Sequence, residues 1–168
     1  MDASSNKKLI KPTDFNSIEL LLDEIIRVLK SDGILIGNAA QDYEIIDFEN
    51  ANSIKLSNEL KRYFQKINGL EGADFISKLN PISELKKVKE YPWFSNVEFT
   101  KEELPEVDNI FIIGDIMIDS HQWGIKLNAE GKTEEIIEMD FYTIVSKSIS
   151  DFLVKFINED PYSLVTDR

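Results

Sequence analysis

The chain has 168 residues, of which 42% are hydrophobic and 30% charged, and this length and composition are typical of one globular domain. It contains no cysteine, which excludes disulfides, thiolate nucleophiles and thiolate-ligated zinc. The net charge of −12 disfavours nucleic acid and membrane surfaces and favours a basic protein partner, although acidity can equally serve solubility alone.

Targeting and membrane segments are not expected. No apolar run approaches the roughly 20 residues that cross a bilayer, and residues 1–12 lack the apolar stretch of a signal peptide. We therefore expect a cytoplasmic protein with a flexible lead-in at 1–13, one domain at 14–160 and a polar tail at 161–168.

The N-terminal half predicts three helices, at 14–31, 39–50 and 57–67, because apolar residues recur there at helical spacing. Thr13 or Asp14 is expected to cap the first helix, and Gly33 to follow its end. A short buried stretch at 34–36 comes next. In the second helix, Ala40, Tyr43 and Ile46 share one face, with Phe48 beside it. The third is expected to start at the cap Ser57 and to bury a stripe of Leu60, Phe64 and Ile67, with Tyr63 beside it. It is expected to end at Asn68 and Gly69, which tolerate positive φ.

The C-terminal half predicts a short strand at 75–79, a helical turn at 82–89 and an irregular segment at 91–109. Three antiparallel strands follow, at 109–118, 121–128 and 132–139, with one face on a core and the other wetter. On the first of these, Phe111 and Ile113 are expected on one face and Ile110, Ile112, Ile116 and Ile118 on the other, and Gly114 indicates a bulge or a close backbone approach. A last helix is expected at 143–158, with Val145 in its buried stripe. Helices and strands are grouped separately along the chain, and this order predicts an α+β fold.

Four stretches of the sequence resemble the SUKH superfamily, which is named for a yeast regulator of cell-wall glucan synthesis. They are 45–52, an I-x-L link that enters a helix at 54–69, the segment NPISEL at 80–85, and the run from FIIGD at 111–115 through WGI at 123–125 and Tyr142 to the helix at 148–156. The resemblance covers residues 45–157. It implies an antiparallel sheet with helices packed around it, and no catalytic residue or cofactor.

The resemblance also implies how such a protein is used. Bacterial members include immunity proteins that neutralise partner toxins, and the fungal member is a scaffold-like regulator of wall synthesis. We therefore expect a non-catalytic protein-binding domain, most simply an immunity protein whose partner is a toxin. The alternatives are a cell-wall regulator scaffold and, third, an enzyme.

Few residues suggest catalysis or metal binding. His121 is the only histidine, and Asp115 and Asp119 would share its face if the strand were continuous. The turn expected at 119–120 breaks that alternation, so we favour a turn or surface role for His121 over a metal or general-base site. Ser120 points away from its neighbour His121 on a strand, which excludes a nucleophile–base pair. No catalytic, cofactor or metal residue is predicted.

Acidic clusters and one tryptophan are the candidate partner contacts. Runs of acidic residues usually form a solvated face, and the alternative is that these residues contact a partner protein. Trp123 lies in phase with Ile125 and Leu127, which favours a core position, whereas Trp93 lies in the irregular segment. The predicted contact residues are Glu102, Glu103, Glu106, Asp108, Glu134, Glu135, Glu138 and Trp93, with Asp140 beside the second cluster.

Overall fold

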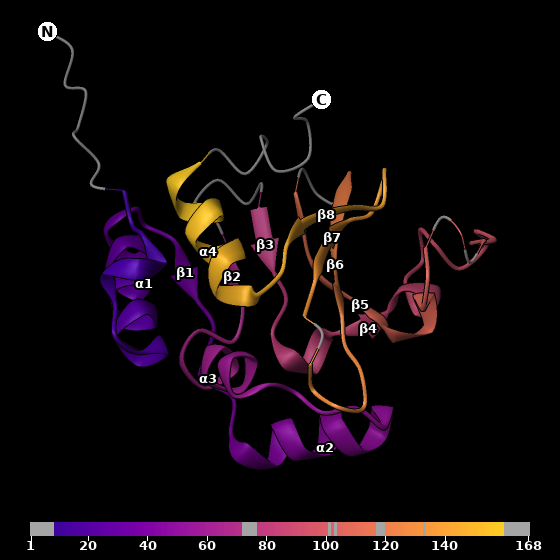
Figure 1. The fold of residues 1–168 in the computed structure, drawn as a ribbon, viewed down its shortest axis with the longest axis horizontal. Coiled ribbons are helices and arrows are strands. Elements are labelled where there is room, and N and C mark those ends of the chain that lie inside the picture. The colour runs from indigo at the N-terminus through magenta and orange to yellow at the C-terminus, as the bar shows by residue number, and fades with distance from the viewer. Residues whose placement is uncertain are drawn as a thin grey trace, which may run out of the picture.

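A computed structural model describes residues 9–71, 77–100, 102, 104–116, 120–132 and 134–159. Within these ranges an antiparallel sheet of eight strands runs in the order β1-β2-β3-β5-β6-β7-β8, and β4 pairs with β5 (Figure 1). The strands are β1 Leu35–Ile36, β2 Leu70–Glu71, β3 Ser77–Leu79, β4 Lys86–Lys87, β5 Ile110–Ile116, β6 His121–Lys126, β7 Ile136–Glu138 and β8 Thr143–Ser146.

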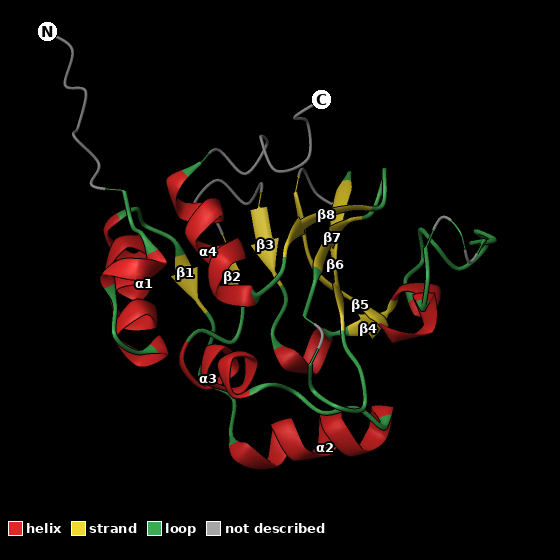
Figure 2. Cartoon of the chain, in the orientation of Figure 1, coloured by secondary structure: helices red, strands yellow, loops and turns green. Residues whose placement is uncertain are grey.

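Four α-helices accompany the sheet in the described part of the chain: α1 Ile18–Ser31, α2 Asp42–Asn52, α3 Asn58–Lys66 and α4 Ile149–Asn158. Short 3-10 turns lie at η1 Pro12–Asp14, η2 Ile82–Glu84, η3 Val88–Glu90 and η4 Val107–Asn109. The helical turn expected at 82–89 therefore divides into η2, β4 and η3. The α+β prediction is confirmed (Figure 2). Among the described residues, no helix has both the length and the apolar character of a membrane span.

Helix α1 begins later than predicted. Residues 12–14 form the separate turn η1, and Ser17 is the true cap, since its side chain accepts a hydrogen bond from the Leu20 N–H. Gly33 has φ +74°, as expected of a residue that follows a helix. Ile10, within the expected lead-in, is buried and exchanges hydrogen bonds with the side chain of Asn158 in α4. The packed part of the chain therefore starts before residue 14.

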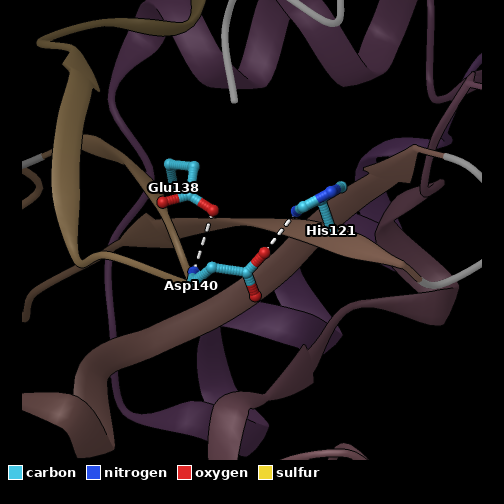
Figure 3. Close-up of side chains that lie close together, drawn as sticks. All are labelled: His121, Glu138 and Asp140. Atoms are coloured by element: carbon cyan, nitrogen blue, oxygen red, sulfur yellow. Dashed lines mark hydrogen bonds and ion pairs between the residues drawn. The ribbon is translucent and has the colours of Figure 1, made fainter. Parts of the chain in front are cut away.

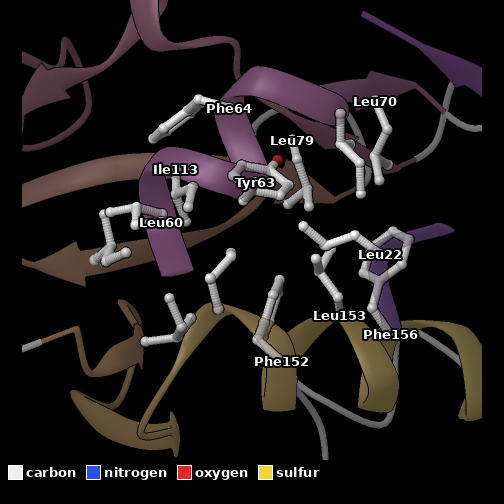
Figure 4. Packing of buried hydrophobic residues seen from close by; sticks show 14 of the residues in the cluster. Leu22, Leu60, Tyr63, Phe64, Leu70, Leu79, Ile113, Phe152, Leu153 and Phe156 are labelled. Atoms are coloured by element: carbon white, nitrogen blue, oxygen red, sulfur yellow. The ribbon is translucent and has the colours of Figure 1, made fainter. Parts of the chain in front are cut away.

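The larger apolar cluster lies between the sheet and the helices α1, α3 and α4 (Figure 4). Trp123 of β6 is fully buried there, and its ring lies 5.3 Å from Phe152 and 5.9 Å from Phe156 of α4, in edge-to-face geometry. Such pairs add about 0.5–1.5 kcal/mol beyond the burial of area. The prediction that Trp123 belongs to the core is confirmed, as is the buried stripe of α3, which the cap Ser57 starts.

The second face of the sheet is also buried, so the expectation of a wet face is wrong. Val88, Phe94 and Leu104 pack against it, and Gln122 and Gly124 of β6 are buried as well. The apolar residues of this smaller cluster are Val88, Phe94, Leu104, Ile110, Ile112, Ile137 and Met139. The irregular segment therefore acts as a second layer, which periodicity alone does not reveal.

Strand β5 changes phase at a bulge. The register with β6 shifts between Ile112 and Gly114, which confirms the predicted irregularity. Because of this shift, Ile116 joins the same cluster as Phe111 and Ile113 instead of the face of Ile110 and Ile112. The predicted side of Ile116 is therefore wrong, and Ile118 lies outside the described residues.

Residues 143–146 form strand β8, where a helix was expected. Tyr142 has φ +57°, which turns the chain back from β7, and β8 then pairs with β7. Helix α4 starts only after Ser148, whose side chain accepts a hydrogen bond from the Asp151 N–H. At the other edge of the sheet, Leu35 of β1 is 62% exposed, so the stretch at 34–36 is not buried throughout.

Gly114 permits β3 to approach β5, and this gives a stability prediction. A Cβ at Gly114 would lie 2.4 Å from the backbone oxygen of Lys78, whereas a Cβ at Gly124 would meet the ends of two side chains, Ile110 and Met139. Backbone cannot move aside as a flexible methionine can. We expect Gly114→Ala to lower the free energy of unfolding by about 1–3 kcal/mol, and Gly124→Ala by less. Urea unfolding measures both, and equal losses would contradict the close approach.

Candidate protein-binding surface

Two of the predicted contact residues, Glu134 and Glu138, are buried, at 8% and 2% exposure. The Glu134 carboxylate accepts a hydrogen bond of 3.0 Å from the Ser57 N–H, and that of Glu138 accepts the N–H groups of Asp140 and Phe141. Burial raises the pKa of both carboxyl groups, and these hydrogen bonds oppose it. Both side chains satisfy backbone donors, so a partner cannot reach them, and their assignment as contacts is corrected.

The first acidic cluster remains at the surface but is partly neutralised. Glu106 pairs with Lys126 at 2.5 Å and Asp108 with Lys89 at 2.9 Å. Glu102 is exposed, Glu135 is half-buried, and Glu103 lies outside the described residues. Trp93 in the same segment is 63% exposed. The segment 91–109 therefore keeps an exposed aromatic residue, while two of its carboxylates already have cationic partners.

The face of helix α2 that carries Tyr43 and Ile46 lies at the surface. These two side chains are 65% and 52% exposed, and the buried side carries Ile45 and Glu49. Phe48 is half-buried and packs edge-to-face on Phe111 at 5.3 Å. The helix therefore turns two large apolar side chains towards solvent.

A groove of about 360 Å³ lies along α2, between this helix and the turn η2. Figure 1 shows α2 as an outlying helix at one end of the molecule. The groove is lined by Tyr43, Glu44, Asp47, Phe48, Ala51, Asn52, Ile82, Ser83 and Leu85. These described lining residues include two carboxylates and no lysine or arginine, so the groove combines apolar walls with negative charge. We name it the α2 groove.

Glu49 explains why α2 is held with this face outwards. Its Oε1 accepts the Leu56 N–H at 2.8 Å and pairs with Lys61 Nζ at 2.9 Å. Burial alone would raise the pKa of Glu49, but the hydrogen bond and the positive charges of Lys61 and Lys55 outweigh it, so the pKa is lowered. A charged anchor thus lies on the inner side of α2 together with Ile45.

His121 meets carboxylates other than those considered from the sequence. Its Nδ1 pairs with Oδ2 of Asp140, and the Glu138 carboxylate lies beside them (Figure 3). Asp115 stands opposite Gln122 on the neighbouring strand, and Asp119 lies outside the described residues. The sequence signal for this group was the hairpin register, because Trp123 opposite Glu138 places His121 opposite Asp140 two residues further on.

No protein-family model matches the chain, and no curated protein matches it either. The surface is therefore interpreted from its own residues.

The anchor Glu49 gives a pH-dependent prediction. Because its folded pKa is lowered, its contribution to stability is present above the ordinary glutamate pKa of about 4.3 and is lost as the pH falls through the folded value. We expect Glu49→Gln to cost about 1–3 kcal/mol at pH 7, and the deficit to shrink below about pH 4. Urea unfolding at both pH values measures it, with the exposed Glu102→Gln as control. A deficit that does not change with pH would contradict the ionic role.

Proposed function

We propose that the chain is a non-catalytic, cytoplasmic protein-binding domain whose α2 groove receives a basic segment of a partner protein, and that it serves as an immunity protein against a toxin. The observation that supports this most directly is that Tyr43, 65% exposed, lines the groove beside the carboxylates Glu44 and Asp47, with no lysine or arginine among the described lining residues. Burial of such side chains by a partner removes apolar area from water at about 25 cal/mol per Å².

The charge of the surface favours a basic partner. The chain as a whole carries −12, and the described lining residues of the α2 groove include the carboxylates Glu44 and Asp47 but no lysine or arginine. A negative surface of this kind steers a positive partner during encounter, and a central tyrosine is a common anchor in binding hot spots. By this criterion the α2 groove is a better docking surface than the segment 91–109, where Lys89 and Lys126 already neutralise two carboxylates.

The immunity role rests on the resemblance to the SUKH superfamily. A toxin that acts on nucleic acid needs a cationic surface, and an acidic inhibitor covers such a surface by complementary charge. Non-covalent inhibitor pairs reach the strongest known affinities, so binding alone is sufficient for neutralisation.

The role is tested by co-expression with the product of the adjacent gene. We expect that protein to be toxic when expressed alone, to become harmless when this chain is present, and to co-purify with it. Toxicity that persists despite equal expression of this folded chain would contradict the immunity role.

The surface is tested by substitutions in the groove. We expect Tyr43→Ala, which removes a side chain that lines the groove, to weaken co-purification and rescue by about tenfold or more, because a hot-spot truncation costs about 2 kcal/mol or more. Asp47→Lys should reduce the rate of association and its dependence on salt. The stability of the free chain should change little, since these side chains are exposed.

Ile144→Ala is the matched control, because Ile144 of β8 is a large apolar side chain that is 49% exposed and does not line the groove. It should leave binding unchanged. Loss of binding in Trp93→Ala, with full binding in the α2 variants, would place the partner on the segment 91–109 and overturn the assignment to the α2 groove.

A further inference from the structure

We propose that His121, Glu138 and Asp140 form a binding site for a divalent first-row transition-metal cation. Each residue offers one ligand atom, and these three atoms lie within 4.8 Å of one another (Figure 3). The proposal concerns a different part of the molecule from the α2 groove, and it does not depend on the proposed function.

The hairpin of β6 and β7 holds the three side chains together. Trp123 stands opposite Glu138 in the antiparallel register, and the Met139 N–H binds the Gln122 carbonyl, so His121 and Asp140 face each other just beyond the paired strands. His121 lies in β6 and Glu138 in β7, and Asp140 lies in the turn that directly follows β7. Ligands on rigid strands keep their geometry better than ligands on loops.

The burial of the three residues suits an open metal site. Glu138 is 2% exposed, whereas the side chains of His121 and Asp140 keep 29% and 33% of their surface in solvent. One carboxylate therefore forms the floor, and the other two ligands form an accessible rim. A cation can enter from solvent, and water can complete its coordination, as in metal sites with three protein ligands.

The charge of the cluster favours a cation. Two carboxylates lie together, and among the described residues no lysine or arginine is seen to pair with either, so the imidazole of His121 is their positive partner only when it is protonated. A divalent ion would neutralise both carboxylates without requiring that proton. His121 Nδ1 and Asp140 Oδ2 contact each other in the structure, and both are atoms that a metal ion would bridge.

The ligand atoms retain the lone pairs that coordination requires. Each Glu138 oxygen accepts one backbone N–H, from Asp140 at 2.9 Å and from Phe141 at 2.8 Å, and a carboxylate oxygen has a second lone pair. These two hydrogen bonds also fix the carboxylate in place, as outer partners of metal ligands do. One imidazole and two carboxylates suit Zn²⁺, Mn²⁺ or Co²⁺.

The test uses the full chain, freed of metal with a chelator, and Co²⁺ as a spectroscopic probe with Zn²⁺ as competitor. We expect visible absorption bands that saturate at one Co²⁺ per chain and disappear when Zn²⁺ is added. His121→Ala and Asp140→Asn should each weaken binding by about tenfold or more, since even outer partners of metal ligands contribute 10–100-fold. Both residues are partly exposed, so these variants should fold, which circular dichroism checks.

Asp108→Asn is the control, because Asp108 is an exposed carboxylate paired with Lys89 in another part of the chain. It should bind Co²⁺ as the unchanged protein does. Absence of saturable Co²⁺ binding would overturn the proposal, and so would binding that His121→Ala and Asp140→Asn leave unchanged.

Discussion

The close contact between β3 and β5 at Gly114 is the constraint on which the arrangement of the sheet depends. Gly114 lies opposite Leu79, and the bulge beside it turns β5 so that Phe111, Ile113 and Ile116 pack beneath the helices. Before the bulge, Ile110 and Ile112 pack on the other face. Because β5 is buried on both faces, each face needs a cover, and the helices and the segment 88–107 provide one each.

Because other parts of the chain cover both faces of β5, helix α2 can keep an exposed side that is open to a partner. The helices α1, α3 and α4 pack on one another, and the fourth helix, α2, packs on the turn η2 and adds Ile45 to the same core. It is attached through Phe48, Ile45 and the charged anchor Glu49. A helix fixed by so few inner contacts is free to carry Tyr43 and Ile46 on its outer side, where a partner can use them.

Much of the fold was predictable from local chemistry, and the errors have physical causes. Residues with one strong local signal were predicted correctly, such as the cap Ser57, the left-handed Gly33 and the bulge at Gly114. Strand β8 was missed because its apolar residues also fit the phase of the following helix, which begins only after the cap Ser148. The buried side of α2 was not identified because Glu49 lies there, and polarity patterns assign such a residue to solvent.

Several acidic side chains serve the fold and not the surface, so acidic runs were a weak guide to the binding surface. Glu49, Glu59, Glu134 and Glu138 accept backbone N–H groups, of Leu56, Ser150, Ser57 and the turn after β7, so their charges serve the fold. Sequence cannot separate these carboxylates from those that face solvent, because both kinds add equally to the net charge. What distinguishes a recognition surface is charge without a cation of its own beside exposed apolar area. Glu44 and Asp47 lie beside Tyr43 in a groove with no lysine or arginine among its described lining residues, whereas Glu106 and Asp108 pair with lysines.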